Sequence, residues 1–577
     1  MNNHKLLIRK GFLLRIRVLS GFVILAGLFL ITRLFFIQSV NSDYYIAKAD
    51  GAYVDTPDSF DRGLIYFEKK DGTRISAASV MTSYILAIKP KDIVDPEDLY
   101  NKINEIYPID KEAFLKKAEK ENDPYEEIVK RVPKDVRDKI MDLDLLGVQM
   151  PRHKWRFYPG ESLAAHTVGF MAYKGDEIAG RYGIERFYNE TLSRDKEDVE
   201  VNIFAEIFSS FYNEKYSTSK SERADIVTTI EPVVQNFMEQ ELTRTMKKFG
   251  SEAANGIIIN PQNGEIIAIA HVPSFDLNNF GKVEDATEYS NPLVENVFEF
   301  GSVVKPLVIA AALDADVISA ETPFYDPGFV QVEDKKIENF DKKGRGQTTM
   351  QTVLAESLNT GMVYSMRALG KSRFRDYMLA YGIGERSGVD LPNESKGLVS
   401  NLQSPRELEY ATASFGQGIS FNPVVLVRAL SAMSNGGYMV QPHVVKKFEY
   451  INGEAKEVVY SKQDGKKVLK DGTSEKISRM LVSIVDNTLG GGKYKMPGHS
   501  IAAKTGTAQI PNPRGGGYIE GKNLHSFFGY FPAYDPKFLV YISNTAPVAR
   551  FASETLTEPF MNIANFLINY YEIPPDR

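Results

Sequence analysis

The chain of 577 residues contains no cysteine, which excludes disulfides, thiolate metal sites and cysteine nucleophiles together. Its seven histidines are scattered singly, without an HExxH or comparable cluster, so we expect neither a metal site nor a cofactor. An excess of charge of one sign is also missing, because the net charge is only −6. A chain without a basic footprint is not expected to bind nucleic acid.

The composition is typical of a folded protein, with 43% hydrophobic and 25% charged residues. Disordered chains are poorer in hydrophobic residues and carry a larger net charge for their length. The length exceeds that of one ordinary domain, so we expect two or three domains.

One long apolar run stands near the N-terminus, at residues 18–40. It can cross a hydrocarbon core of about 30 Å as a helix, and Arg33 near its far end can reach the interface. The preceding residues carry five Lys and Arg and no acid, which favours a cytoplasmic tail at 1–17 and an extracytoplasmic body. We therefore predict a single-pass anchor in the cell membrane. A cleaved signal peptide is the alternative, but no A-x-A-like cleavage site follows the run.

Residues 41–220 are rich in charge and in turn signals. The stretches 95–121 and 124–143 are helix-like, whereas 84–90 is prone to form a strand. Residues 193–225 are polar enough to form a linker or a mobile edge. We predict one domain over this region.

Near residue 226 the polar sequence gives way to apolar strand and helix patterns, and we place a second domain at 221–577. A short strand precedes a helix that tolerates Pro232 in its first turn, and Asn263-Gly264 between two apolar runs predicts a hairpin. The middle is largely helical. Further strands and a closing helix are expected at 500–510, 526–531, 538–544 and 552–571. This order predicts an α+β fold, an antiparallel sheet covered by helices.

The stretch FEFGSVVKPLVIAAAL, residues 298–313, places Ser302 and Lys305 at the start of an apolar helix. Pro306 must lie in the first helical turn, so the helix is expected to begin at about Ser302. The free N–H groups of that turn favour negative charge developing on the serine oxygen. The positive helix end and burial should lower the pKa of Lys305 and let it act as a base. The stretch can therefore build an activated serine.

An SxxK string alone is weak, since the chain holds two others, at 193–196 and 217–220, in polar surroundings. Two further motifs strengthen the signal: SLN at 357–359 and KTGT at 504–507. Gly506 in the latter allows another backbone or a substrate to approach closely. We predict that the three motifs converge around one hydroxyl.

The three motifs in this order resemble those of the penicillin-binding proteins, the serine D,D-transpeptidases of the cell wall. The resemblance extends to Arg62-Gly63-x-Ile65, to RFYPGESLAAHTVGF at 156–170 and to SFGQGISFNP near residue 420. It implies a transmembrane helix at 18–40, an elongated pedestal domain of the dimerisation type at 41–220, and a β-lactamase-like transpeptidase domain at 221–577. It implies no metal and no cofactor.

The resemblance also implies roles for five catalytic residues. Ser302 would attack the D-Ala–D-Ala carbonyl of a stem peptide, and Lys305 would take its proton. Ser357 would relay a proton to the leaving amine, and Asn359 would contact the Lys305 amine and the substrate backbone. Lys504 would add positive potential.

Substrate binding falls, by the same resemblance, to the rest of the KTGT motif. The hydroxyls of Thr505 and Thr507 would meet the terminal carboxylate, and Gly506 would let the strand approach. The oxyanion would lie between the backbone N–H groups of Ser302 and Thr507. An amine of a neighbouring stem peptide would then take the acyl group, and β-lactams would stop at the acyl stage as covalent inhibitors.

The chain departs from the family pattern at a few places. Phe300 replaces the usual proline before Gly-Ser, and the middle motif is SLN where SSN is commoner. The turn after RGLI is expanded to YFEKKDG, and polar SRDKED follows Leu192. None of these changes removes a catalytic group.

Residues 41–220 are too few for a glycosyltransferase domain, so the resemblance is to the monofunctional, class B members. Glycan polymerisation would come from a partner, a SEDS-type membrane glycosyltransferase, together with other division proteins. Total length and landmarks favour the division type over the elongation type. Two other readings stay open: a carboxypeptidase or β-lactamase-like hydrolase, and a non-catalytic scaffold or β-lactam sensor.

Overall fold

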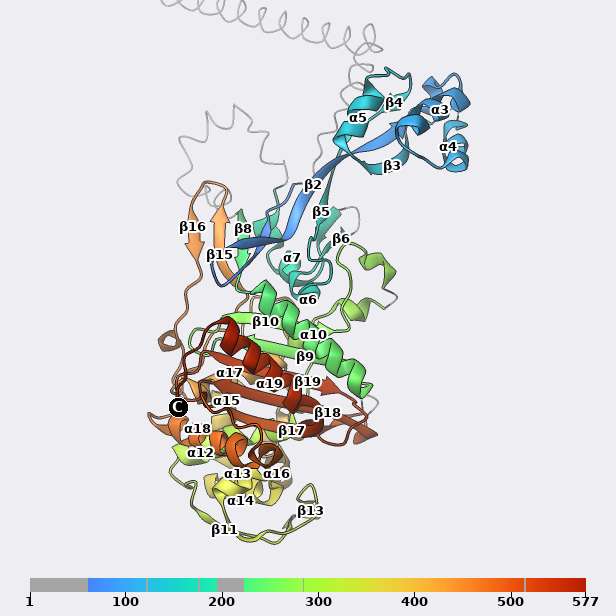
Figure 1. Ribbon diagram of the computed structural model, residues 1–577. Coiled ribbons are helices and arrows are strands. Elements are labelled where there is room, and N and C mark those ends of the chain that lie inside the picture. The colour runs from blue at the N-terminus through green and yellow to red at the C-terminus, as the bar shows by residue number, and fades with distance from the viewer. Residues whose placement is uncertain (1–60, 121–122, 175–176, 195–222, 284, 513–514) are drawn as a thin grey trace, which may run out of the picture. The chain divides into compact units, whose positions relative to one another are not determined.

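The computed structural model describes residues 61–120, 123–174, 177–194, 223–283, 285–512 and 515–577 (Figure 1). The predicted tail at 1–17 and the predicted transmembrane helix at 18–40 lie outside these residues. Among the residues described, none of the helices combines the length and apolarity needed to span a bilayer. The chain divides into two compact units, of which the first holds Met81–Trp155 and the second Arg62–Val80, Arg156–Arg194 and the C-terminal part from residue 223.

The first unit is a small sheet with three helices. The later half of β2 (Arg74–Ile88) pairs antiparallel with β3 (Glu126–Val132) and β4 (Val148–Gln149). Their core holds Leu86, Ile88, Ile103, Phe114 and Val132. The helices are α3 (Pro96–Ile106), α4 (Lys111–Ala118) and α5 (Lys134–Met141).

Two helix predictions in this unit are wrong, and a proline explains each. The stretch 95–121 is two helices, because α3 ends before Pro108. The stretch 124–143 begins as strand β3 and becomes helical only at Lys134, after Pro133. A proline disfavours helical backbone in the residue before it, so each helix must end before the proline or start after it.

The second unit opens with a sheet built from distant parts of the chain. Strand β1 (Ile65–Glu68) pairs antiparallel with the first half of β2 and parallel with β8 (Ala224–Thr228). Strand β15 (Val445–Tyr450) pairs with β8 and with β16 (Ala455–Glu457). The smaller elements of this part are β5 (Arg152–Phe157), which crosses from the first unit, α6 (Ala165–Val168), β6 (Met171–Lys174), β7 (Glu177–Gly180), α7 (Gly183–Phe187) and α8 (Asn189–Leu192).

A buried ion triad joins the segments that carry the RGxI motif and its neighbours. Glu185 is fully buried and accepts hydrogen bonds from Arg62 Nε and Arg156 Nε, each at 2.6 Å. Arg156 also donates to the Gly63 carbonyl at 2.8 Å. Burial by itself would raise the pKa of Glu185, but the charges of Arg156 and Arg62 outweigh it, and the pKa lies below its ordinary value.

The catalytic half is a five-stranded antiparallel sheet in the order β10–β9–β19–β18–β17. Its strands are β9 (Ala253–Ile259), β10 (Ile266–Val272), β17 (Ala502–Pro511), β18 (Tyr518–Phe531) and β19 (Phe538–Thr545). The hairpin predicted at Asn263-Gly264, the three C-terminal strands and the closing helix are confirmed. Gly264 adopts a φ of 87° there, the left-handed conformation that glycine accepts readily.

Helices cover both faces of this sheet, which confirms the predicted α+β class (Figure 1). On one face α10 (Pro232–Phe249) and α19 (Ala552–Tyr570) share an apolar cluster with the strands. The opposite face carries a helical layer whose members are α11 (Pro292–Glu295), α12 (Lys305–Asp314), α13 (Met350–Ala355), α14 (Asn359–Leu369), α15 (Lys371–Ala380), α16 (Glu407–Ala413), α17 (Pro423–Ser434) and α18 (Thr473–Ser483).

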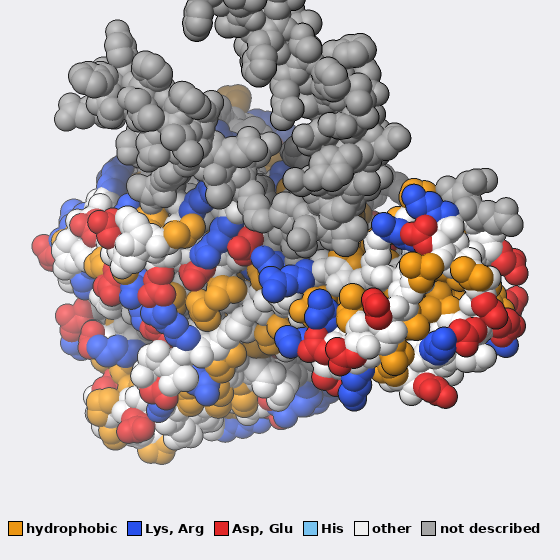
Figure 2. All heavy atoms as spheres, turned by 90° about the horizontal axis from the view of Figure 1, so that it is seen from above, with side chains coloured by type: hydrophobic (Ala, Val, Ile, Leu, Met, Phe, Trp, Pro, Cys, Tyr) orange, Lys and Arg blue, Asp and Glu red, His pale blue; other side chains and the backbone are white. Residues whose placement is uncertain are grey.

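Two small two-stranded sheets interrupt the helical layer between α12 and α13. Strand β11 (Pro323–Asp326) pairs with β14 (Gly346–Thr349), and β12 (Phe329–Val332) pairs with β13 (Lys335–Glu338). The sequence pattern predicted mainly helix in this region. On the face drawn in Figure 2, positive and negative side chains are interspersed among hydrophobic ones. That described face offers no continuous basic surface of the kind that binds phosphate backbones.

Replacing Glu185 by glutamine should lower the free energy of unfolding by about 3–5 kcal/mol, because two buried guanidinium groups lose their counter-charge. Thermal unfolding of the protein measures the change. The matched control is Glu449→Gln, which breaks the more exposed ion pair with Arg74 at 2.7 Å and should cost about 1 kcal/mol or less. Equal losses for the two variants would contradict the structural role of the triad.

Candidate active site

Ser302 lies in a single 3₁₀ turn, Gly301–Val303, directly before α12. The helix itself begins at Lys305 and not at Ser302 as expected, although Pro306 does lie in its first turn. The turn forms because Gly301 has a φ of 61° and Val304 N–H donates to the Gly301 carbonyl at 3.0 Å. This backbone path leaves the Ser302 side chain partly exposed at the start of the buried helix.

Lys305 is fully buried and is surrounded by the middle motif. Its Nζ donates to the Ser357 carbonyl at 2.7 Å and to Asn359 Oδ1 at 2.8 Å, and it lies 3.1 Å from Ser357 Oγ. Burial, and after it the charge of Lys504, lower the pKa of Lys305 well below its ordinary value. Burial was expected to act in this way, whereas the second charge comes from the KTGT strand.

A neutral amine suits these contacts. A neutral amine has two N–H groups, which can donate to the Ser357 backbone carbonyl and to Asn359 Oδ1. It also has a lone pair that can take a proton. The arrangement therefore places a base three residues along the chain from Ser302. Such a pair can activate a serine for nucleophilic attack.

The KTGT motif occupies β17, directly beside the Ser302 turn. A Cβ on Gly506 would lie 2.9 Å from the Phe300 carbonyl and 3.0 Å from Val303 Cγ1, and one on Gly301 would lie 2.8 Å from the Thr507 carbonyl. Both glycines are therefore needed for the strand and the turn to approach so closely. The geometry agrees with the close approach expected at Gly506.

The polar side chains of β17 differ in their surroundings. Lys504 is buried, its Nζ donates to the Thr505 carbonyl at 3.0 Å, and burial lowers its pKa to about 8. Thr505 and Thr507 are partly exposed. Thr507 Oγ1 accepts a hydrogen bond from the Ala552 N–H at 3.2 Å, at the start of α19.

The structure thus brings all three motifs together. Ser302 and Ser357 are partly exposed, whereas Lys305 and Lys504 are buried. Within the described ranges, no group of three or more His, Asp or Glu could hold a metal ion.

Sequence reasoning missed the segment that supports the middle motif. Asn359 Nδ2 donates to the Glu338 carbonyl at 2.9 Å. Thr360 Oγ1 donates to Asp326 Oδ1 at 2.8 Å, although the two residues are distant in sequence. Phe340, which is 52% exposed, forms an edge-to-face pair with Phe551 at 5.9 Å. No spacing or composition signal marks these contacts, because they join loops far apart along the chain.

Comparison with known proteins assigns the family. Residues 255–564 match the penicillin-binding protein transpeptidase domain, and residues 61–220 match the penicillin-binding protein dimerisation domain. The chain therefore belongs to the penicillin-binding proteins, and it is a transpeptidase of their class B. The resemblance seen in the sequence is confirmed.

The similar proteins cover most of the chain. Stage V sporulation protein D of Bacillus subtilis (strain 168) is 29% identical over 91% of this chain and 81% of its own length. The probable peptidoglycan D,D-transpeptidase PenA of Neisseria meningitidis serogroup A is 25% identical over 96% of this chain and 92% of its own. The crystal structure of penicillin-binding protein 2X from Streptococcus thermophilus has a TM-score of 0.72 at 21% identity, over 89% of this chain and 81% of that one.

Replacing Lys504 by glutamine should raise the pKa of Lys305, because the charge of Lys504 is one of the causes that lower it. As the solution is acidified, Lys305 of the variant is protonated at a higher pH than Lys305 of the wild type. The acid limb of the acylation rate therefore moves to higher pH. Stopped-flow acylation by a β-lactam, followed as the first-order rate constant at saturation, measures the limb. Lys522→Gln, which removes an exposed lysine paired with Glu252, serves as the control. A limb that stays in place or moves to lower pH would contradict the coupling.

Proposed function

We propose that this transpeptidase cross-links peptidoglycan stem peptides through an acyl-enzyme on Ser302. The observation that supports it most is the fully buried Lys305, held by Ser357 and Asn359 beside the serine turn. A buried lysine with a lowered pKa and no carboxylate among its hydrogen-bond acceptors is suited to act as a base. Ser302 and Ser357 are partly exposed, whereas both lysines are buried.

In the first half of the reaction Ser302 Oγ attacks the penultimate D-Ala carbonyl of the donor peptide while Lys305 takes its proton. The tetrahedral oxyanion is stabilised by the backbone N–H groups of Ser302 and Thr507. The C–N bond then breaks, and the leaving D-alanine amine receives a proton relayed through Ser357. The product is an ester between Ser302 and the shortened stem peptide.

In the second half an amine from a neighbouring stem peptide attacks the ester. Lys305 takes a proton from this amine and passes it to the Ser302 oxygen, which leaves as the hydroxyl, and a new peptide bond forms. Before the first half-reaction, the charge of Lys504 and the hydroxyls of Thr505 and Thr507 hold the donor's terminal carboxylate, which then leaves with the D-alanine. Gly506 lets the substrate backbone lie against β17, and Asn359 contacts it from the other side.

β-Lactams imitate the donor peptide and form the same ester, which makes them covalent inhibitors of this chain. Hydrolysis would need a base that activates water against the ester, and the three motifs contribute no carboxylate for that role. A carboxypeptidase or β-lactamase-like activity is therefore the second reading, and a non-catalytic sensor or scaffold the third.

The adduct of labelled penicillin should map to Ser302 by peptide mass spectrometry, and Ser302→Ala should abolish it, because the ester bond loses its oxygen. Ser420→Ala, which changes the serine of another SxN string, should label like the wild type. An adduct lifetime of many minutes supports the transpeptidase, whereas a lifetime of seconds favours the hydrolase. Undiminished labelling of Ser302→Ala would defeat the assignment of the nucleophile.

We further propose that residues 18–40 anchor the chain in the cell membrane with the catalytic half outside, and that it acts at the division septum beside a SEDS-type glycosyltransferase. The apolar run and the basic residues before it support the anchor. A functional fluorescent fusion should concentrate at the septum. Enrichment along the lateral wall would assign the elongation role instead, with the same catalytic chemistry.

A further inference from the structure

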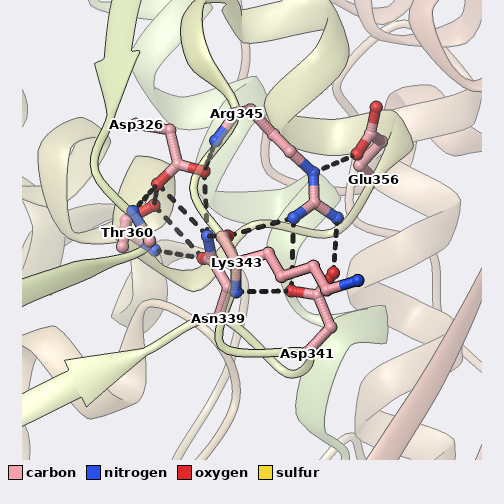
Figure 3. Close-up of polar contacts among 8 residues, drawn as sticks. Asp326, Asn339, Asp341, Lys343, Arg345, Glu356 and Thr360 are labelled. Carbon is pink, nitrogen blue, oxygen red and sulfur yellow. Dashed lines mark hydrogen bonds and ion pairs between the residues drawn. The ribbon is translucent and has the colours of Figure 1, made fainter.

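A polar network lies beside the middle motif, within the segment 326–345, which we call the clasp (Figure 3). The clasp leaves β11, forms the β12–β13 hairpin and returns to β14. At its start, Asp326 is 1% exposed, and Asn339 after the hairpin is 2% exposed. Two polar side chains buried this deeply must be paired, and the pairing fixes the loop.

Asp326 is the centre of the network. Its carboxylate accepts hydrogen bonds from Asn339 Nδ2 at 2.9 Å, Arg345 N–H at 3.0 Å and Gly328 N–H at 2.9 Å. A fourth bond comes from Thr360 Oγ1 at 2.8 Å, outside the clasp. Since a carboxylate has about four acceptor positions, Asp326 is saturated and ties the two ends of the clasp to α14.

The clasp holds the chain on both sides of Ser357. Before it, Arg345 Nε donates to Glu356 Oε2 at 2.6 Å, and the same guanidinium pairs with Asp341 at 2.9 Å. After it, the Asn359 amide donates to the Glu338 carbonyl at 2.9 Å. Together with the Thr360 contact, three of the five residues within or next to the motif, 356–360, are bound to one segment.

Ser357 needs such support because its φ is 58°. This left-handed conformation is unfavourable for a residue with a side chain, and it persists only when the surroundings determine it. It is this conformation that directs the Ser357 carbonyl to Lys305 Nζ at 2.7 Å. If the turn relaxed, the buried amine would lose two of its three polar neighbours.

We propose that the clasp is a positioning element for acyl transfer, which holds the Ser357–Asn359 turn so that Lys305 keeps its contacts. The clasp acts through the motif, and its network residues do not carry the reaction themselves. The inference rests on the proposed function of Ser302 and Lys305. It adds Asp326, Arg345 and Thr360 as positioning residues, none of which belongs to the three motifs.

Thr360 offers the sharpest test because valine has its shape without its hydroxyl, and serine keeps the hydroxyl. Saturation kinetics with a β-lactam separate the dissociation constant of the initial complex from the acylation rate constant. Thr360→Val should lower the rate constant about tenfold or more, since small misplacements of catalytic groups are costly, and leave the dissociation constant unchanged. Thr360→Ser should restore the rate constant. An acylation rate constant equal to the wild type in Thr360→Val would overturn the proposal.

Two further variants guard the interpretation. Arg406→Gln removes an ion pair at 3.0 Å with Glu333, which lies at the tip of the β12–β13 hairpin and away from the motif. This variant should leave both constants unchanged. If Thr360→Val does not fold, Arg345→Gln breaks the partly exposed pair with Glu356 and should lower only the rate constant, with Arg345→Lys retaining part of it. Equal changes in both constants for all variants would show a merely structural role and overturn the proposal. Absence of the wild-type adduct on Ser302 would instead overturn the proposed function.

Discussion

The burial of Lys305 is the constraint on which the rest of the site depends. An ammonium group taken out of water without a counter-charge is costly, so the neutral amine is favoured. Its hydrogen-bond acceptors, from Ser357 and Asn359, are neutral oxygens, and the nearby charge of Lys504 is of the same sign. The helix that carries the lysine and the motif around it keep this amine buried and oriented.

Close backbone approach is the second requirement, and it depends on packing behind the serine turn. Phe300, which stands where the family usually has proline, is fully buried and packs against Phe421 at 5.0 Å and Tyr541 at 5.8 Å between ring centroids. Its carbonyl accepts a hydrogen bond from Ser526 Oγ at 3.1 Å. The aromatic ring thus anchors the turn to the sheet by packing.

The catalytic unit also uses residues from the beginning of the chain. Strand β1 pairs with β8 some 160 residues later in the chain, as in the Ile65–Ile226 pair, and β15 closes the same sheet. The Glu185 triad secures the neighbouring segments. The two compact units therefore do not follow the sequence order, because Arg62–Val80 and Arg156–Arg194 of the predicted pedestal belong to the same unit as the catalytic half.

The sequence by itself determined the features that short-range physics controls: the Asn263-Gly264 hairpin, the closing helix with its buried Phe560, and the early position of Pro306. Local pattern failed at 124–143, where Pro133 separates a strand from a helix, and at the start of α12, where Gly301 allows a tight turn. Only the tertiary structure decided the contacts of the clasp with Glu356, Asn359 and Thr360, and it alone brought Lys504 close enough to lower the pKa of Lys305. They depend on which distant segments pack together, and a hydrogen bond across loops leaves no periodic trace in the chain.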